Sequence, residues 1–395
     1  MKHQQVFIAE RVAYLAATTG TTRVVYGRVH AGTVVIWSER PNAFLAPVGV
    51  ISPGPLPQGR ACQLPVVLIA SAGPPTAYVQ DANGEFVETR TTVVSTVRDL
   101  QRRNHGVLES NALQGVVVAA VGAGSIGSNV LRLLAQAGVG EVRIADAAVF
   151  SPGNACRHTL GLDAVGLQKS FALGDQLQLL NPDLEVRTLG VPLSTATFEQ
   201  YKEFLIGSSL VLVSTDSISA NLLAQDVCLE AGVIPSVFVG CWERAVGAEI
   251  LLSDPAAGGA CYGCMRGGLP SADADKGTID YSSITAPTDP PQPGLGADVT
   301  FVSAIAAKVC LVQLTADWDS GLLQRDRSLL YVGTRAEDVF QQACQVSSIG
   351  TVADPDCWHC AYLQGTGVEH HDIRNSIAVG VARTGRVARR VQLDR

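Results

Sequence analysis

A glycine-rich turn between a buried strand and a helix constrains the fold of this chain more than any other feature. Residues 115–121 are an apolar run of strand length, and the hexapeptide GAGSIG follows at 122–127. In such a turn Gly122 permits a tight bend, Gly124 lets a phosphate approach the backbone, and Gly127 lets the next helix pack closely on the strand. The free N–H groups and positive dipole end of that helix favour an anion. The pattern predicts a nucleotide site, for a dehydrogenase or for an ATP-using enzyme.

Strand and helix patterns alternate along the chain after this turn. Short apolar runs are separated by longer segments in which apolar residues recur at helical spacing. This alternation is typical of a doubly wound, mostly parallel Rossmann-like sheet in an α/β domain, which we assign to residues 98–395. The strands are expected at 115–121, 141–145, around 186, at 210–213 and at 234–239, and the helices at 128–137, from about 166 to 180, at 222–230 and at 297–314.

Residues 1–97 differ in composition and predict a small N-terminal α/β domain. Two alternating runs over 24–37 predict a hairpin, and residues 64–70 predict a strand. A helix over 96–113 is expected to lead into the second domain. No catalytic or metal-binding set of side chains is visible in the first 97 residues. Their role is open, and recruitment of a partner protein is one hypothesis.

Composition and charge exclude several classes of protein. The formal net charge is −7 with 16% charged residues and no basic stripe, so nucleic acid is not an expected partner. The N-terminus lacks the pattern of a secretory signal, and we find no run of about twenty apolar residues that predicts a membrane segment. We therefore expect a cytoplasmic protein. In that compartment, the ten cysteines indicate metal binding or reactive thiols before disulfides.

Several polar side chains are expected near the glycine turn. Asp146 follows the second strand and is placed to accept the ribose hydroxyls of a nucleotide. Arg157 comes soon after it, and its planar fork suits phosphate oxygens. Lys169 opens a helix, where a cation is unfavourable against the dipole unless an anion lies nearby. Asp216 follows the buried strand 210–213, at the sheet edge where ligands bind, and suits Mg²⁺ held against phosphates.

Two C-x-x-C pairs predict a structural metal site. Each pair can present two thiolates on one side of a turn, and two such turns make a tetrahedral zinc site. We prefer zinc to a redox function because neither pair begins a thioredoxin-like helix. A metal shared by the two pairs would tie the C-terminal segment back onto the sheet. The four candidate ligands are Cys261, Cys264, Cys357 and Cys360.

Taken in order, these motifs resemble the E1-like adenylating superfamily, which includes ThiF, MoeB and the adenylation domains of ubiquitin-activating enzymes. The resemblance covers about residues 98–362. It implies that Asp146 binds the ribose, that Asn154, Arg157 and Lys169 hold the triphosphate, and that Asp216 coordinates magnesium. It also implies a homodimer in which an arginine before the glycine turn reaches the active site of the partner subunit. The candidates for that arginine are Arg103 and Arg102, with Arg98 behind them.

The resemblance further implies the activity. We expect ATP-dependent adenylation of the C-terminal carboxylate of a small ubiquitin-like or sulfur-carrier protein, with release of pyrophosphate and with Mg²⁺ and Zn²⁺ as cofactors. The carrier's tail, ending in glycine, would pass beneath a flexible crossover loop at 271–298. The product could pass to a conjugating (E2-like) enzyme in a bacterial ubiquitin-like antiphage pathway. Sulfur-carrier activation in thiamine or molybdopterin biosynthesis is the alternative.

Three positions depart from the family pattern. Ala148 stands where a second acidic residue is usual, and His158 stands where glutamine is common. No cysteine lies between Cys264 and Cys310, the segment that carries the thioester cysteine in members that form one. Either the enzyme stops at the acyl-adenylate, or another thiol serves, of which Cys241 is the best candidate although a buried structural role suits it better. A substitution in the loop, at Ala286 for instance, is a third reading.

Other classes of protein share parts of this pattern. A relative that modifies a tRNA base would need a basic surface that the sequence lacks. An NAD-dependent dehydrogenase is compatible with the glycine turn and Asp146, yet no His, Lys or Tyr set for hydride chemistry is visible. A non-catalytic scaffold would have no need to keep Arg157, Lys169 and Asp216 together.

Overall fold

The computed structural model is described here for the residues whose placement it defines. These are residues 5–30, 32–54, 64–71, 73–81, 83–95, 99–109, 111–266, 293–315, 328–357, 359–360 and 363. The chain forms two compact units. One comprises residues 1–115, 132–142 and 171–187, and the other comprises 116–131, 143–170 and 188–395. The predicted boundary between residues 97 and 98 stays a prediction.

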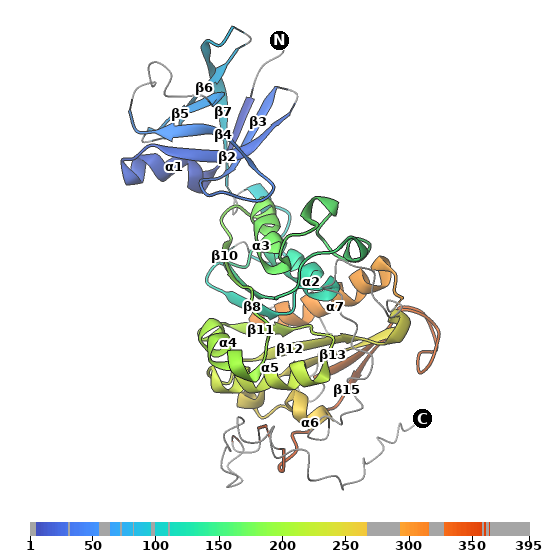
Figure 1. The fold of residues 1–395 in the computed structure, drawn as a ribbon. Coiled ribbons are helices and arrows are strands. Elements are labelled where there is room, and N and C mark those ends of the chain that lie inside the picture. The colour runs from blue at the N-terminus through green and yellow to red at the C-terminus, as the bar shows by residue number, and fades with distance from the viewer. Residues whose placement is uncertain are drawn as a thin grey trace. The chain divides into compact units, whose positions relative to one another are not determined.

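An eight-stranded sheet carries the glycine turn (Figure 1). Its spatial order is β10-β9-β8-β11-β12-β13-β14-β15. β11 runs parallel to both β8 and β12, whereas β13, β14 and β15 add antiparallel strands at one end. The chain therefore turns from one half of the sheet to the other between β8 and β11, as in doubly wound folds. The strands are β8 (Val117–Val121), β9 (Glu141–Ala145), β10 (Glu185–Leu189), β11 (Leu210–Val213), β12 (Ser236–Cys241), β13 (Gly247–Ser253), β14 (Leu329–Gly333) and β15 (Val346–Ile349).

Helices cover both faces of this sheet. Figure 1 shows α7 on one side of β11 and β12 and α4 with α5 on the other. Their apolar side chains meet those of the strands, so most strand residues in the middle of the sheet are inaccessible to water. The helices are α2 (Ser125–Ala137), α3 (Lys169–Leu180), α4 (Phe198–Leu205), α5 (Ile218–Glu230), α6 (Tyr262–Arg266) and α7 (Gly296–Leu314).

The α/β prediction for this region is confirmed, with two exceptions. The antiparallel strands β13 to β15 were not predicted. The helix predicted over 96–113 is wrong in most of its described part, because residues 101–108 and 111–115 form turns and bends and only residues 99–100 are helical. Leu100 and Val107 are 44% and 70% exposed, so residues 99–109 bury little of the apolar surface that stabilises an amphipathic helix.

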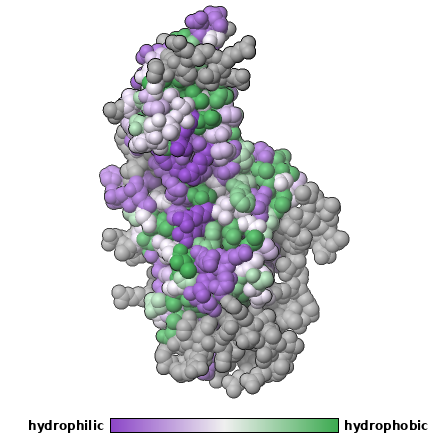
Figure 2. All heavy atoms as spheres, turned by 60° about the vertical axis from the view of Figure 1, so that its left-hand side comes forward, coloured by the Kyte–Doolittle hydropathy of each residue, from purple (hydrophilic) through white to green (hydrophobic). Residues whose placement is uncertain are grey.

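One described helix is long and apolar enough to cross a membrane, contrary to the sequence-based expectation. It is α7, which has 19 residues. In the structure α7 packs against β11, β12 and β13, and Val302, Ala306 and Val309 are buried. Exposed apolar side chains elsewhere are interspersed with hydrophilic ones on the face drawn in Figure 2.

The N-terminal strands form a closed barrel of order β1-β3-β2-β4-β5-β6-β7 (Figure 1). β1 and β7 pair in parallel and close it, and the hairpin of β2 and β3 is confirmed. The expectation of an α/β domain is wrong, because one helix, α1 (Glu10–Thr19), accompanies seven strands. Pairing of the first strand with the last is long-range and leaves no local pattern. The strands are β1 (Gln5–Ala9), β2 (Arg23–His30), β3 (Thr33–Ser38), β4 (Ala46–Ser52), β5 (Val66–Ile69), β6 (Thr76–Gln80) and β7 (Phe86–Val94).

The glycine turn sets how closely α2 follows β8. Gly122 has a φ of +96°, a conformation that glycine adopts without strain. A Cβ at Gly127 would lie 2.2 Å from the carbonyl oxygen of Gly122 and 2.7 Å from Oγ of Ser214. A Cβ at Gly124 would meet no atom within 4 Å. Gly127 is therefore required for packing, whereas Gly124 leaves open space above the turn.

This difference predicts opposite results for two matched substitutions. Gly127→Ala should lower the free energy of unfolding by about 1–3 kcal/mol, because the backbone oxygen of Gly122 has to move. Gly124→Ala should leave it within about 0.5 kcal/mol of wild type. Urea denaturation followed by circular dichroism measures both. Equal stability of the two variants would contradict the packing role of Gly127.

Candidate active site

A cavity of about 1130 Å³ lies where the chain turns between β8 and β11. Val121 is paired with Val213, so the segments after the two strands leave the sheet side by side. Because the C-terminal ends of parallel strands meet at this edge, their loops form a crevice that can receive a ligand. The predicted residues that line the cavity are Gly122, Gly124, Asp146, Asn154, Arg157, Lys169 and Asp216.

Asp146 holds the glycine turn in place. Its Oδ2 accepts a 2.7 Å hydrogen bond from the N–H of Ala123, and its Oδ1 accepts one of 2.7 Å from the N–H of Ala148. A carboxylate has about four acceptor positions, so capacity remains for ligand hydroxyls. The hydrogen bond from Ala148 to Asp146 comes from the backbone amide, so it forms whichever side chain position 148 carries.

His158 is a buried structural residue beneath the turn. Its Nδ1 accepts from the N–H of Leu160 at 3.0 Å, so the proton lies on Nε2, which donates to the carbonyl oxygen of Ala123 at 2.7 Å. Burial lowers the pKa of His158 to about 4, opposed by the bond to Ala123 and reinforced by the charge of Lys169. A neutral imidazole with one donor and one acceptor can replace a glutamine carboxamide here.

Asn154 and Arg157 lie on the segment after Asp146. Oδ1 of Asn154 accepts from the N–H of Ser151 at 3.0 Å, which fixes the start of a short 3₁₀ turn over 152–154. The carbonyl oxygen of Arg157 accepts from Nδ2 of Asn129 on α2 at 3.1 Å. Helix α2 thus anchors the backbone of Arg157, which lines the cavity.

Lys169 is the first residue of α3 and is only 5% exposed. Its N–H bonds the carbonyl oxygen of Ala148 at 2.9 Å, and Gln168 pairs with Val149. Within the described part of the chain, no carboxylate forms an ion pair with Lys169. A buried ammonium at a helix N-terminus is costly without an anion, and Lys169 lines the wall of the cavity.

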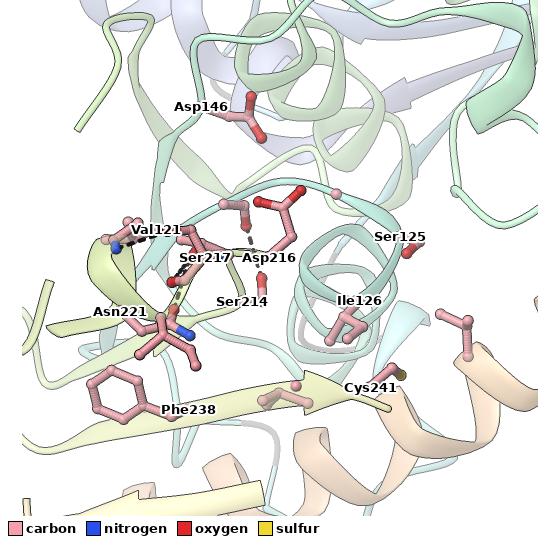
Figure 3. Close-up of a pocket in the computed structure, with 18 of the residues that line it drawn as sticks. Val121, Ser125, Ile126, Asp146, Ser214, Asp216, Ser217, Asn221, Phe238 and Cys241 are labelled. Carbon is pink, nitrogen blue, oxygen red and sulfur yellow. Dashed lines mark hydrogen bonds between the residues drawn. The ribbon is translucent and has the colours of Figure 1, made fainter. Parts of the chain in front are cut away.

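Asp216 is exposed and lies at the open edge of the same cavity. It follows Thr215 and precedes Ser217, whose side chain caps α5 by accepting from the N–H of Ala220 at 3.2 Å. Figure 3 shows Asp216 beside the glycine turn together with Asp146 and Ser125. The structure therefore gathers the predicted carboxylates and cations around one turn.

The far part of the cavity contains residues that the sequence analysis missed. Tyr262 stacks on Phe238 with ring centroids 4.6 Å apart, and the guanidinium of Arg266 lies 5.2 Å from the Tyr262 ring centroid. Arg266 also forms an ion pair with Glu249. The only local signal is that Tyr262 occupies a spacer position in the first C-x-x-C pair, to which the sequence analysis assigns no role.

Cys241 ends β12 and is the only cysteine that lines the described cavity. Burial raises the pKa of its thiol to about 11, and the positive charge of Arg157 offsets this only in part. At neutral pH the group is almost entirely a thiol, which is a poor nucleophile.

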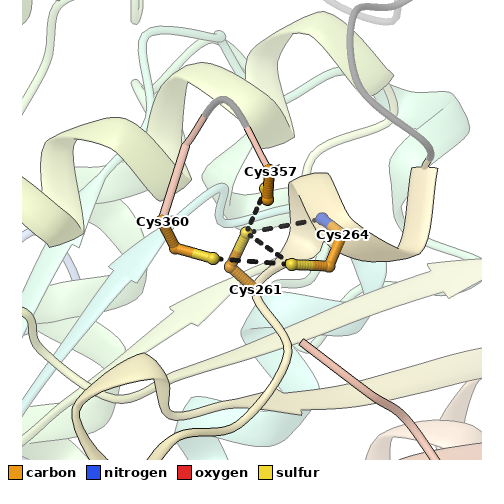
Figure 4. Close-up of side chains that lie close together, drawn as sticks. All are labelled: Cys261, Cys264, Cys357 and Cys360. Carbon is orange, nitrogen blue, oxygen red and sulfur yellow. Dashed lines mark hydrogen bonds between the residues drawn. The ribbon is translucent and has the colours of Figure 1, made fainter. Parts of the chain in front are cut away.

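The four predicted metal ligands form one cluster. Their sulfur atoms all lie within 4.8 Å of one another, and Figure 4 shows them gathered between the two turns. The distances from Sγ of Cys261 to those of Cys264 and Cys357 are both 3.6 Å. Four thiolates around zinc, with bonds of about 2.3 Å, would be about 3.8 Å apart. The sulfur–sulfur distances therefore fit a zinc ion held by these four cysteines.

Some predicted elements lie outside the cavity. Gly127 contributes packing only. Arg102 and Arg103 are exposed and do not line it, and their assignment to a partner subunit stays a prediction. Arg98 and Ala286 lie outside the described residues, as does most of the predicted crossover loop. Its last residues, from Gly296, begin α7.

A sequence model of the ThiF family matches residues 97–326, more than half of the chain. The chain belongs to the ThiF family. This match covers the glycine turn and all the predicted nucleotide-site residues, and it ends before the second C-x-x-C pair.

Similar curated proteins are activating enzymes by name. Ubiquitin-like modifier-activating enzyme 5 of Oryza sativa subsp. japonica is 24% identical over 249 residues, which are 60% of this chain and 58% of that protein. The SAMP-activating enzyme E1 of Haloferax volcanii is 30% identical over 169 residues, 42% of this chain and 58% of that protein. The adenylyltransferase and sulfurtransferase UBA4 of Yarrowia lipolytica is 31% identical over 157 residues, with shares of 40% and 38%. The chain thus spans less than two thirds of these relatives.

A solved structure has the same fold. The crystal structure of Escherichia coli MccB matches with a TM-score of 0.51 and 18% identity, over 67% of this chain and 69% of that chain. At this identity the likeness extends to the ThiF-family fold alone.

The buried imidazole predicts a pH dependence of stability. The pKa of His158 is depressed in the folded state, so the unfolded chain takes up the proton first as pH falls from about 6.5 to about 4. Wild type should lose about 2–3 kcal/mol through this group between pH 7.5 and 4.5. His158→Gln, which keeps a donor and an acceptor, should lack this loss. Urea denaturation at the two pH values measures the difference, and parallel losses in both proteins would rule it out.

The four-cysteine cluster predicts about one zinc ion per chain. Cys264→Ser should lose the metal, because three thiolates and a hydroxyl bind zinc weakly. Cys344→Ser, at an exposed cysteine outside the cluster, should keep it. Atomic emission of the purified proteins measures the metal content. A folded wild type without zinc would refute the site.

Proposed function

We propose that this chain catalyses ATP-dependent adenylation of the C-terminal carboxylate of a small ubiquitin-like or sulfur-carrier protein. The observation that carries the proposal is the convergence on one cavity of a glycine turn, a buried ammonium that forms no ion pair with any described residue, and a strand-end carboxylate. These are Gly124, Lys169 and Asp216. Membership of the ThiF family and the names of the relatives support the same activity.

Each end of ATP has complementary groups in the cavity. The ribose hydroxyls would bond the remaining acceptor positions of Asp146. The triphosphate would lie over Gly124, where no protein atom intervenes, with Lys169 and Arg157 against its oxygens. Asp216 would hold magnesium on the phosphates, since carboxylate oxygens are ligands that Mg²⁺ prefers. Magnesium would supply charge neutralisation, which is the main requirement of phosphoryl chemistry.

The reaction needs little proton chemistry from the protein. A carboxylate is already anionic at neutral pH, so it attacks the α-phosphorus without a general base. A new bond forms between a carboxylate oxygen and the α-phosphorus, the bond from that phosphorus to the bridging oxygen breaks, and pyrophosphate leaves with the electron pair. The role of Lys169 and Arg157 is to position the reactants and to stabilise the charge on the leaving group.

The carrier and the fate of its adenylate are a finer part of the proposal. The relatives' names mention a ubiquitin-like modifier, SAMP and sulfur transfer, so both kinds of carrier are compatible with this cavity. We favour a cytoplasmic, bacterial ubiquitin-like conjugation system in which a homodimer passes its product to a conjugating enzyme. The raised pKa of Cys241 makes it a weak acceptor for a thioester, which favours release of the adenylate.

Nucleotide binding tests the first half of the proposal. Calorimetry should detect binding of MgATP and no binding of NAD. Lys169→Met should weaken MgATP by about tenfold or more, the effect of losing a charged hydrogen bond. Lys202→Met is the matched control. Lys202 on α4 forms an ion pair with Glu230 on α5, so this variant should bind MgATP like wild type. Equal affinities of the two variants would contradict the site.

Isotope exchange tests the chemistry. ATP–pyrophosphate exchange should depend on a small protein ending in glycine, such as one encoded beside this gene. Asp216→Asn should reduce the exchange by about a hundredfold or more. Exchange that needs no carrier carboxylate, or survives both Asp216→Asn and Lys169→Met, would refute the proposal.

A further inference from the structure

A residue inside the first C-x-x-C turn bonds helix α5. The N–H of Tyr262 donates to Oε1 of Gln225 at 3.0 Å, and the same oxygen accepts from Oγ of Ser253 at 3.0 Å. The hydroxyl of Tyr262 accepts from Nδ2 of Asn221 at 3.3 Å. Gln225 is 0% exposed, so loss of its bonds cannot be compensated by water.

A residue inside the second C-x-x-C turn bonds the same helix. Nδ1 of His359 lies in a short hydrogen bond with Oδ1 of Asp226, and both side chains are buried. The imidazole also touches the first turn, since a Cβ at Gly263 would lie 2.3 Å from its Cδ2. Each of the two turns that carry the cysteines is therefore attached to α5 through a side chain that is not itself a thiol.

The other end of α5 reaches the cavity. Asn221, which bonds Tyr262, accepts at Oδ1 a 2.7 Å hydrogen bond from Oγ1 of Thr215. Thr215 directly precedes Asp216, and Figure 3 shows Asn221, Ser217 and Asp216 along this segment. A continuous set of hydrogen bonds thus joins the first cysteine turn to the strand end that carries Asp216.

We propose that α5 couples the two sites, so that a metal in the four-cysteine cluster and a magnesium nucleotide in the cavity stabilise each other. This inference rests on the proposed function. Four thiolates within 4.8 Å repel one another unless a cation lies among them, so the metal determines where both turns sit. Tyr262 and His359 bond α5, so a shift of the turns moves this helix. Asn221 on α5 in turn bonds Thr215. Gln225 and Asp226 are positioning residues in this scheme, since neither lines the cavity.

Thermodynamic reciprocity makes the coupling measurable from the metal side. If the metal favours the arrangement that binds MgATP, then MgATP must favour retention of the metal by the same factor. Reciprocity holds for the equilibrium affinities, and the ratio of zinc release rates with and without nucleotide is a kinetic signature of the same coupling. A merely structural role of Gln225 would change both rates and leave their ratio unaltered.

The experiment measures zinc release from the full chain as purified. A chromogenic chelator reports the release rate with and without saturating MgATP, and calorimetry on the same samples reports nucleotide binding. MgATP should slow release about fivefold or more in wild type. It should slow release less than twofold in Gln225→Met, which removes the acceptor for Tyr262 and Ser253. Asp226→Asn, a milder change of equal size, should fall between them.

The matched control is Gln178→Met on α3. Nε2 of Gln178 donates to the carbonyl oxygen of Leu184 at 3.3 Å, and this variant should keep the protection of wild type. If wild type binds MgATP but releases zinc at an unchanged rate, or if Gln225→Met and Asp226→Asn keep full protection, the coupling is refuted. Absence of MgATP binding to wild type would instead refute the proposed function, and this inference with it.

Discussion

The close contact between the glycine turn and the end of β11 is the constraint on which the site depends. Gly127 lies against the carbonyl oxygen of Gly122, and Oγ of Ser214 bonds that same oxygen at 3.1 Å. This contact holds the start of α2 on the end of β8. It also brings Asp216, which follows Ser214 and Thr215, beside the glycine turn. Everything the cavity offers to a nucleotide is arranged around a turn that has no room for a side chain at Gly127.

The ionisable side chains around this turn differ in how their charge is compensated. Two backbone amides donate hydrogen bonds to the carboxylate of Asp146, and burial keeps the imidazole of His158 neutral. Neither side chain therefore places an uncompensated charge beneath the turn. Lys169 is the buried exception. An ammonium in that place is tolerable when an anion completes the site, which is why the arrangement suits a polyphosphate rather than an uncharged ligand.

Helix α5 contacts both the turns of the four-cysteine cluster and the cavity. α5 contributes Asn221 to the cavity wall and Asp226 to the cysteine turns, with Gln225 between them. Buried polar side chains of this kind hold a single geometry because each unmet bond costs about 1–3 kcal/mol. A cluster that looks purely structural in sequence can thereby influence the position of a ligand group in the cavity.

The sequence by itself determined the parts of this protein that are encoded locally. Periodicity placed β8, β9 and β11, and the spacing of glycines, charged residues and cysteines identified the cavity residues and the four thiols. Only the tertiary structure decided what depends on distant pairing: the parallel closure of β1 on β7 into a barrel, the pairing of β13 with β14, and the bonds of Tyr262 and His359 to α5. The physical reason is that such contacts join residues tens to more than a hundred positions apart, and neither partner carries a mark of the other in its own neighbourhood.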